Sequence, residues 1–181
     1  MNIYLTGYRC SGKTSTGKAL ARMMGWPFWD TDDELVKSRG MSITDIVHTR
    51  GWDVFREFEK ETLQFVASGD SQVVATGGGI VLFDENVQLM KLTGTIVWLR
   101  VRPETVAERM AADPVSLTQR PALTDQGALR EIEALLSARN PIYHSAMDFS
   151  IDTDVLETEA ICQCILKAIY NPLTGYRPLE K

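Results

Sequence analysis

The architecture of this chain can be worked out from one segment near its N-terminus, Gly7-Tyr8-Arg9-Cys10-Ser11-Gly12-Lys13-Thr14. The segment matches the pattern GxxxxGK[ST], and it lies between apolar residues 3–5 and amphipathic residues 19–24, as a strand, loop and helix require. Glycines permit turns in which successive N–H groups and the N-terminus of the next helix converge on phosphate oxygens. We therefore predict a nucleotide-phosphate loop, in which Lys13 reaches the β- and γ-phosphates and the Thr14 hydroxyl is placed to bind Mg²⁺. The alternative is a glycine-rich turn that only caps a helix.

Apolar and amphipathic segments alternate along the rest of the chain. Strands are expected at 28–29, 73–75, 95–99 and about 147–151, and helices at about 54–66, 84–92, 103–112, 129–139 and 155–170. A capping box at Ser42-Ile43-Thr44-Asp45 predicts a further short helix that ends at Gly51. Strands that alternate with helices form a parallel sheet covered on both faces. The prediction is a three-layer α/β/α fold around a central five-stranded parallel sheet, which is the P-loop kinase fold with a mobile lid.

Chain length and loop composition predict the domain organisation. At 181 residues the chain is near the usual size of one domain, and we expect a single domain over residues 1–170. From Asp113 to Gly127 the periodicity is lost and proline, serine, threonine and aspartate accumulate, which predicts a mobile lid loop. The tail from Asn171 to Lys181 carries proline and glycine and is expected to be flexible.

Composition and charge exclude several kinds of partner. Lys and Arg number 19 against 24 Asp and Glu, and the formal charge of -5 repels a phosphate backbone, so no nucleic-acid partner is expected. The three cysteines fit neither a disulfide framework nor a zinc site, which indicates a reducing compartment and makes the cytoplasm the expected location. The N-terminus shows no signal peptide, and no membrane span is expected. We expect a monomer whose partners are small molecules.

Two carboxylates follow the second expected strand. Asp30 and Asp32 come directly after Phe28-Trp29, at the carboxyl end of a strand, where open α/β sheets place their ligands. One can hold a magnesium-bound water while the other faces an attacking hydroxyl, because phosphoryl transfer depends on orientation more than on a strong base. Alternatively, residues 30–34 only supply the N-cap and first-turn acids of the next helix. Spacing alone leaves both interpretations open.

Four further segments concern the acceptor of the phosphoryl group. They are Asp30-Thr31-Asp32, Gly51-Trp52-Asp53-Val54-Phe55-Arg56-Glu57-Phe58-Glu59, Thr76-Gly77-Gly78-Gly79 and Gln119-Arg120-Pro121. With the phosphate loop, their order and spacing resemble the shikimate kinase family from about Met1 to Ile169. The resemblance implies Mg²⁺-dependent transfer of the γ-phosphoryl of ATP to the 3-hydroxyl of shikimate. The implied products are shikimate 3-phosphate and ADP, in the chorismate pathway of aromatic amino-acid biosynthesis.

The resemblance also implies roles for residues around the acceptor. Asp32 would orient or deprotonate the attacking hydroxyl, and Asp30 would support Mg²⁺ through water. Arg56, held by Glu59, and Arg139 would grip the shikimate carboxylate, because a guanidinium fork matches a carboxylate in two hydrogen bonds. The implied substrate-binding residues are Asp32, Arg56, Gly77, Gly78, Gly79 and Arg139, with Gly78 offering its N–H. The implied metal-binding residues are Thr14, Asp30 and Asp32.

Other implied roles concern the nucleotide. Arg120 resembles the family's lid arginine, which closes over the phosphates, and Arg109 would lie against the adenine. The implied nucleotide-binding residues are Gly7, Ser11, Gly12, Lys13, Thr14, Ser15, Arg109, Arg120, Asp152 and Thr153. The implied catalytic residues are Lys13, Asp32 and Arg120.

These implied roles have plainer alternatives. Arg56 and Arg139 can be surface residues paired with helical acids such as Glu59 and Glu133, and residues 77–79 can be a simple strand-to-helix turn. For the whole chain, one alternative is another small P-loop kinase that acts on gluconate or a nucleoside monophosphate. The other is a nucleotide sensor without catalytic turnover.

Cys10 departs from the commoner family pattern, which has glycine at this position of the loop. A thiol beside Lys13 and close to a helix N-terminus should react as thiolate more readily than Cys162 or Cys164. The alternative is a side chain that points into the core and is inert.

Overall fold

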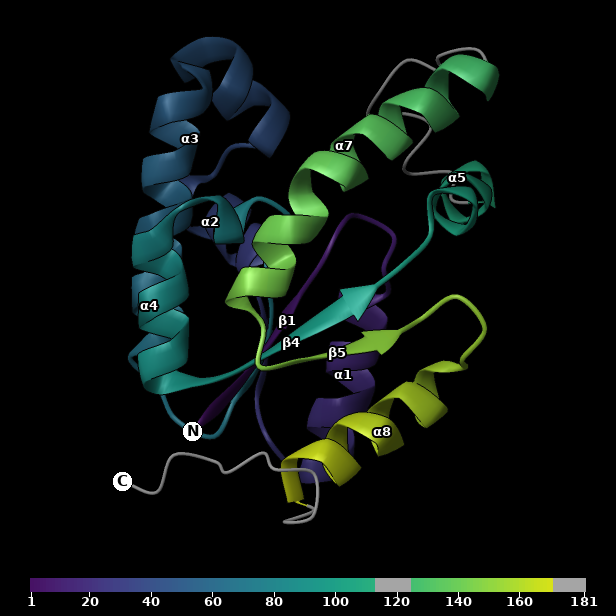
Figure 1. Ribbon diagram of the computed structural model, residues 1–181. Coiled ribbons are helices and arrows are strands. Elements are labelled where there is room, and N and C mark those ends of the chain that lie inside the picture. Colours follow the sequence, from purple (N-terminus) through teal and green to yellow (C-terminus); the bar gives the residue numbers. More distant parts are fainter. Residues whose placement is uncertain (113–124, 171–181) are drawn as a thin grey trace.

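A parallel five-stranded sheet lies at the centre of the molecule (Figure 1). The computed structural model describes residues 1–112 and 125–170, without the side chains of Asp125, Gln126 and Ala128. The strands are β1 (Asn2–Thr6), β2 (Phe28–Asp30), β3 (Val73–Ala75), β4 (Gly94–Arg100) and β5 (Phe149–Asp152). They pair in the order β2-β3-β1-β4-β5, and every pair is parallel. The predicted α/β class and strand number are confirmed.

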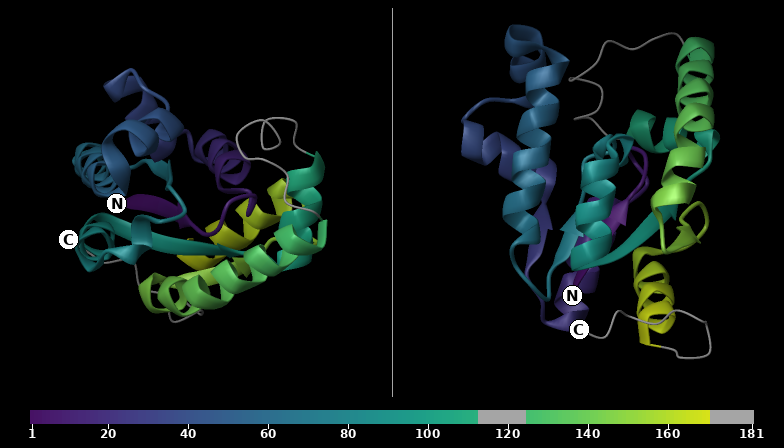
Figure 2. Two further views of the ribbon diagram at one scale, coloured as in Figure 1. Left: turned by 90° about the horizontal axis from the view of Figure 1, so that it is seen from above. Right: turned by 60° about the vertical axis from the view of Figure 1, so that its left-hand side comes forward.

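Helices cover both faces of this sheet (Figure 2). They are α1 (Lys13–Met24), α2 (Thr31–Arg39), α3 (Ile43–Ala67), α4 (Asp84–Thr93), α5 (Pro103–Ala112), α7 (Asp125–Ala146) and α8 (Thr158–Tyr170), with a 3-10 turn at Ile80–Leu82. Helices α3 and α7 both extend beyond the carboxyl ends of the strands (Figure 1). Of the helices that the structure describes, none is both long enough and apolar enough to cross a membrane.

Alternation along β1 shows why the sheet needs two helical layers. Ile3 and Leu5 pack in a cluster with Leu20 of α1 and Ile165 of α8, whereas Tyr4, between them, packs on the opposite face in the cluster formed with α3, α4 and α7. Successive strand side chains point to opposite faces, so a strand that is buried at every position, as β1 is, must be covered on both sides. Each fully buried aliphatic side chain of this kind contributes about 1.5–3 kcal/mol.

Several local predictions are confirmed. Helix α5 has the predicted bounds, Pro103–Ala112. Ser42 caps α3, because its hydroxyl accepts a hydrogen bond from the Asp45 N–H at 3.1 Å. At Gly51 the backbone leaves helical geometry, with φ 85° and ψ 170°, so the predicted end of the short helix is a kink within α3.

Other boundaries differ from the sequence prediction. Residues 31–39 form α2, which was expected only as an alternative to a functional role for the carboxylates. Helix α7 begins at Asp125, so the last part of the expected loop 113–127 is helical, and it continues past Arg139 to Ala146 with Pro141 inside it. The continuation buries Tyr143 and Ala146 against the sheet, which compensates for the hydrogen bond that proline cannot donate. The remainder of the expected lid, residues 113–124, and the tail 171–181 lie outside the described residues.

Candidate active site

The phosphate loop connects β1 to α1 at the carboxyl edge of the sheet, where the predicted site residues converge. Gly7 has φ 141°, and a Cβ there would lie 2.5 Å from the Leu99 carbonyl oxygen. Gly12 has φ 89° and occupies the N-cap of α1. Cys10, at φ 58°, also adopts the left-handed conformation that glycine takes more easily. The loop geometry therefore favours glycine at the position that Cys10 fills.

Lys13 lies over this loop. Its Nζ donates hydrogen bonds to the carbonyl oxygens of Gly7 at 3.0 Å and Tyr8 at 2.8 Å. Burial lowers the pKa of Lys13, while the negative charges of Asp32 and Asp30 oppose that change. A cation held at the loop by neutral carbonyls can turn to a phosphate, because charged oxygens are stronger acceptors.

Hydroxyl groups flank Lys13 on both sides. Thr14 and Ser15 are exposed, and the Ser15 hydroxyl donates to the Gly12 carbonyl at 3.0 Å. The Ser11 hydroxyl is buried and has no hydrogen-bond partner among the described residues. A buried hydroxyl without a partner in this loop fits a site that a ligand completes.

The Asp30 carboxylate makes a hydrogen bond with each of its two oxygens. Its Oδ1 accepts a hydrogen bond from the Asp32 N–H at 3.1 Å and so caps α2. Its Oδ2 accepts a hydrogen bond from the Thr14 hydroxyl at 2.8 Å. One carboxylate therefore ends β2, begins α2 and meets the first turn of α1.

Oxygen atoms of this kind suit magnesium. Among the described residues, no group of three or more His, Cys, Asp or Glu side chains could hold a metal ion. Mg²⁺ commonly takes only one or two protein oxygens and completes its octahedron with phosphates and water. Thr14 and Asp30 thus fit a magnesium ion that arrives with a nucleotide.

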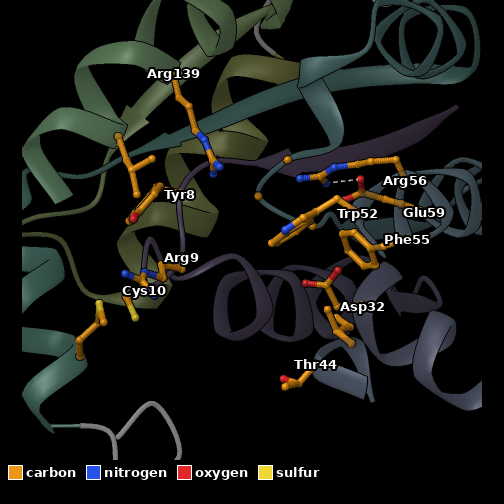
Figure 3. Close-up of a pocket in the computed structure, with 16 residues that line it drawn as sticks. Tyr8, Arg9, Cys10, Asp32, Thr44, Trp52, Phe55, Arg56, Glu59 and Arg139 are labelled. Atoms are coloured by element: carbon orange, nitrogen blue, oxygen red, sulfur yellow. Dashed lines mark hydrogen bonds and ion pairs between the residues drawn. The ribbon is translucent and has the colours of Figure 1, made fainter. Parts of the chain in front are cut away.

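Asp32 stands in the first turn of α2 and lines the acceptor cavity, a hollow of about 370 Å³ beside the phosphate loop (Figure 3). Burial raises the pKa of Asp32 to about 6, and the neighbouring charges of Asp30 and Glu59 add to this effect. Lys13 acts in the opposite direction. A carboxylate with this pKa is mostly ionised at neutral pH, yet it binds a proton more readily than an exposed aspartate.

All the predicted substrate-binding residues line the acceptor cavity. They are Asp32, Arg56, Gly77, Gly78, Gly79 and Arg139. Arg56 and Arg139 extend from opposite walls toward one another, with Asp32 on a third side (Figure 3). Other residues also line it, including Tyr8, Arg9, Thr44 and Met110, for which the sequence indicated no contact with a substrate. Tyr8 and Arg9 occupy variable positions of the phosphate-loop pattern, and Thr44 and Met110 resemble ordinary helix residues.

Arg56 is paired with Glu59, as the plainer alternative proposed, but the pair is not on the surface. Arg56 Nη1 donates to Glu59 Oε2 at 2.6 Å, and the Glu59 side chain is 2% exposed. Burial raises the pKa of Glu59, while Arg56 lowers it. The guanidinium also lies 5.0 Å from the centre of the Phe55 ring and 5.5 Å from that of Trp52. A cation fixed by one carboxylate and two aromatic rings is positioned before any ligand arrives.

The three glycines after β3 let these charged groups approach closely. A Cβ on Gly77 would lie 2.7 Å from both Asp32 Oδ1 and Glu59 Oε1. A Cβ on Gly79 would lie 2.5 Å from Arg56 Nη1. Residues 77–79 therefore form the surface against which Asp32, Glu59 and Arg56 pack.

A second hollow of about 460 Å³, the nucleotide cavity, lies on the other side of the phosphate loop, between that loop and the segment that leads from β5 to α8. Arg109 lines it and donates to the carbonyl oxygens of Cys10, at 2.9 Å, and of Thr153. Thr153 also lines it. Ser11, Gly12 and Ser15 contribute from the phosphate loop.

Asp152, a further predicted nucleotide-binding residue, has a partner outside the nucleotide cavity. Among the described residues that line the nucleotide cavity, Asp154 is present and Asp152 is not. Asp152 instead forms a two-pronged ion pair with Arg100, its partner in the register of β4 and β5. Both side chains are about half exposed. Arg120, the predicted lid arginine, lies outside the described residues.

Comparison with known proteins identifies the family. The family model described as shikimate kinase matches residues 9–170. The chain is 42% identical to a shikimate kinase of Moorella thermoacetica, over 93% of this chain and 94% of the relative. It is 39% identical to shikimate kinase 2 of Dickeya chrysanthemi, over 89% and 92% of the two chains. The structure of a shikimate kinase from Acinetobacter baumannii in complex with shikimate matches with a TM-score of 0.84 and 30% identity, over 99% of this chain and 95% of that one. This chain therefore belongs to the shikimate kinase family.

Proposed function

We propose that this protein transfers the γ-phosphoryl of ATP to the 3-hydroxyl of shikimate and releases shikimate 3-phosphate and ADP. The observation that carries the proposal is the acceptor cavity, in which two arginines face each other beside a carboxylate of raised pKa, next to the phosphate loop. Shikimate offers a carboxylate for the arginines and ring hydroxyls for Asp32. The cavity therefore has a partner for each polar end of this acceptor.

The arginines bind and orient the acceptor. A guanidinium presents donors in a planar fork that matches a carboxylate, so Arg56 and Arg139 fix the acid end of the molecule. With the acid end fixed, the 3-hydroxyl is directed toward Asp32 and the phosphate loop. Such positioning contributes much of the rate in phosphoryl transfer, because the loose transition state forms little new bonding to the attacking oxygen.

Asp32 handles the proton of the attacking hydroxyl. In its ionised form it accepts a hydrogen bond from that hydroxyl and receives the proton as the oxygen bonds to phosphorus. Its pKa of about 6 lies close to neutral pH, which makes it a better proton acceptor than an ordinary aspartate.

The phosphate loop and Lys13 bind the nucleotide phosphates, and Thr14 and Asp30 are the residues that would hold Mg²⁺. When bound, the ion neutralises negative charge on the phosphate oxygens. Arg120 is proposed as a further cation for the phosphates. Arg109 and Thr153 would lie near the adenine in the nucleotide cavity.

Two broader proposals accompany this activity. We place the reaction in the cytoplasm, in the pathway to chorismate and the aromatic amino acids. The three cysteines match no disulfide framework, which fits a reducing compartment. We also propose that the enzyme works as a monomer with small-molecule partners only.

The test is ADP release from MgATP, measured by a coupled assay with shikimate, gluconate or AMP as the acceptor. The proposal requires rapid release with shikimate and background release with the other two. Preferential release with gluconate or AMP would assign the protein to another small P-loop kinase activity. Absence of turnover with every acceptor would favour a nucleotide sensor.

A further inference from the structure

A buried tyrosine with no part in the mechanism above connects two walls of the acceptor cavity. Tyr143 lies on α7, after Pro141, and is 1% exposed. Its ring stacks on Trp98 of β4, with 5.7 Å between the ring centres and 19° between the planes. The ring is therefore fixed by the core, and its hydroxyl is directed at the edge of the sheet where the cavity lies.

The Tyr143 hydroxyl lies between two site residues. It donates a hydrogen bond to the carbonyl oxygen of Gly78. The Arg139 guanidinium, which has only donors to offer, is close enough to lower the pKa of the same hydroxyl. Burial raises the pKa of Tyr143 to about 12, so the hydroxyl keeps its proton throughout the working pH range. One hydroxyl thus faces an arginine on one wall and donates to the glycine segment on another.

The contact with Gly78 also bears on Arg56. The Gly78 carbonyl shares its rigid peptide plane with the Gly79 N–H, so a hydrogen bond to the carbonyl fixes the orientation of that plane. Gly79 is the residue against which Arg56 packs, since a Cβ there would lie 2.5 Å from Arg56 Nη1. Tyr143 therefore lies beside Arg139 and supports the surface on which Arg56 lies.

We propose that Tyr143 is a positioning residue for binding of the acceptor carboxylate, because its hydroxyl holds Arg139 and the Gly78–Gly79 peptide in one fixed arrangement. The inference rests on the proposed function, in which Arg56 and Arg139 bind that carboxylate. Tyr143 is not among the described residues that line the nucleotide cavity, so its effect should fall on acceptor binding and not on ATP.

The test variant is Tyr143→Phe, which keeps the ring and its stacking on Trp98 and removes only the hydroxyl. The matched control is Tyr4→Phe. Tyr4 is 0% exposed, belongs to the same apolar cluster and makes hydrogen bonds to Thr93 at 2.7 Å and Asn2 at 3.2 Å, but it does not line the acceptor cavity. Loss of a buried tyrosine hydroxyl should lower Tm in both variants. Only the loss at residue 143 should alter the cavity.

The expected result is a rise of about 10-fold in the KM for shikimate in Tyr143→Phe, with the KM for ATP within about 2-fold of wild type. Tyr4→Phe should keep both KM values. The methyl ester of shikimate, used as a weak competitor, should lose no affinity in Tyr143→Phe, because it presents no carboxylate charge. In an Arg139→Lys background, Tyr143→Phe should raise the shikimate KM by clearly less than 10-fold, since the arginine that it positions is already gone.

Provided that the wild-type enzyme phosphorylates shikimate, any of three outcomes would overturn the inference. The first is an unchanged KM for shikimate in Tyr143→Phe, and the second is an equal rise in the KM for ATP in that variant. The third is the same change in both KM values in Tyr4→Phe. Tyr143→Phe could be too unstable for kinetics. In that case the affinity of this variant for shikimate is measured by calorimetry at a temperature below its Tm, in place of the comparison in the Arg139→Lys background. Wild-type affinity there would also reject the role. A wild-type enzyme that ignores shikimate would instead reject the proposed function.

Discussion

Gly79 lies so close to Arg56 that a Cβ on residue 79 would be 2.5 Å from the Arg56 Nη1 atom. The Gly79 backbone, with φ -103° and ψ 0°, is accessible to alanine, so a substitution there strains contacts and not the main chain. The group that must move is the guanidinium at the end of the flexible Arg56 side chain, which we propose binds the acceptor carboxylate. The contact therefore concerns function more than folding.

Gly79→Ala should raise the KM for shikimate by about 10-fold, because it displaces the Arg56 guanidinium, while Tm stays close to the wild-type value. The control is Gly17→Ala in α1, where a Cβ would lie 2.5 Å from Cε2 of the Phe28 ring. Overpacking there costs about 1–3 kcal/mol, and alanine's better helix propensity returns only about 1 kcal/mol. Gly17→Ala should thus lower Tm and leave the shikimate KM unchanged; the opposite pattern in the two variants would contradict this account.

Asp32→Asn should lower kcat by at least about 100-fold with little change in ATP affinity, because Asp32 faces the acceptor and not the phosphates. Kinetics with saturating shikimate and nucleotide titrations measure the two quantities separately. Equal losses in turnover and in nucleotide affinity would show that Asp32 serves the nucleotide.

The same variant should be more stable than wild type at alkaline pH. The pKa of Asp32 is raised from 3.8 to about 6 by burial, so the folded state binds the proton more tightly than the unfolded state. The ionised carboxylate therefore destabilises the fold above about pH 6, by at most about 3 kcal/mol, and this penalty disappears as the pH falls toward 3.8. Thermal melts of both proteins should differ at pH 8 and converge near pH 4. A constant difference across this range would argue against ionisation as the cause.

Arg56→Lys should raise the KM for shikimate by about 10-fold or more, because a point charge replaces a planar fork in the pair with Glu59 and in the contact with the acceptor. Arg100→Lys is the control, since Arg100 also makes a two-pronged ion pair, with Asp152, but at an exposed position. Exposed ion pairs contribute little to the free energy of unfolding, and Arg100 does not line the acceptor cavity, so Arg100→Lys should keep wild-type kinetics. An unchanged KM in Arg56→Lys would remove Arg56 from the acceptor site.

Cys10 should be alkylated at neutral pH before Cys162 or Cys164, and MgATP should block the reaction. Cys10 lines both cavities and lies close enough to Lys13 for their charges to attract. Cys162 is 0% exposed and burial raises the pKa of its thiol, whereas Cys164 is exposed. Peptide mapping after brief alkylation distinguishes the three; first labelling of Cys164 would leave Cys10 without special reactivity.

The sequence was sufficient for features that depend on local chemistry. The glycine pattern predicts the phosphate loop, and the capping residues predict the helix start at Ser42. Hydrophobic periodicity predicts the alternation of strands and helices along the chain. All three features appear in the structure. Arg56, Asp32 and Gly77–Gly79 were found because a family motif joined residues that are far apart in the chain. Their meeting in one cavity could not be derived from spacing.

Features that depend on how distant segments pack together could not be predicted from the sequence. Asp152 pairs with Arg100 because β4 and β5 lie side by side in that register, and nothing in either segment indicates the partner. Helix α2 buries only Thr31 and Leu35, too few positions to give a periodic pattern. Tyr143 reaches Gly78 only because α7 continues through Pro141, where the sequence predicts that a helix ends.

The central claim is that the acceptor cavity presents the 3-hydroxyl of shikimate to ATP, and the most direct measurement is identification of the product. The enzyme would be incubated with MgATP and shikimate, and the product examined by phosphorus–proton correlation NMR. The account predicts one phosphate ester, coupled to the proton on carbon 3 of shikimate, formed in a one-to-one ratio with ADP and slowed by Asp32→Asn. An ester at another hydroxyl, or ADP released without any phosphorylated shikimate, would contradict it.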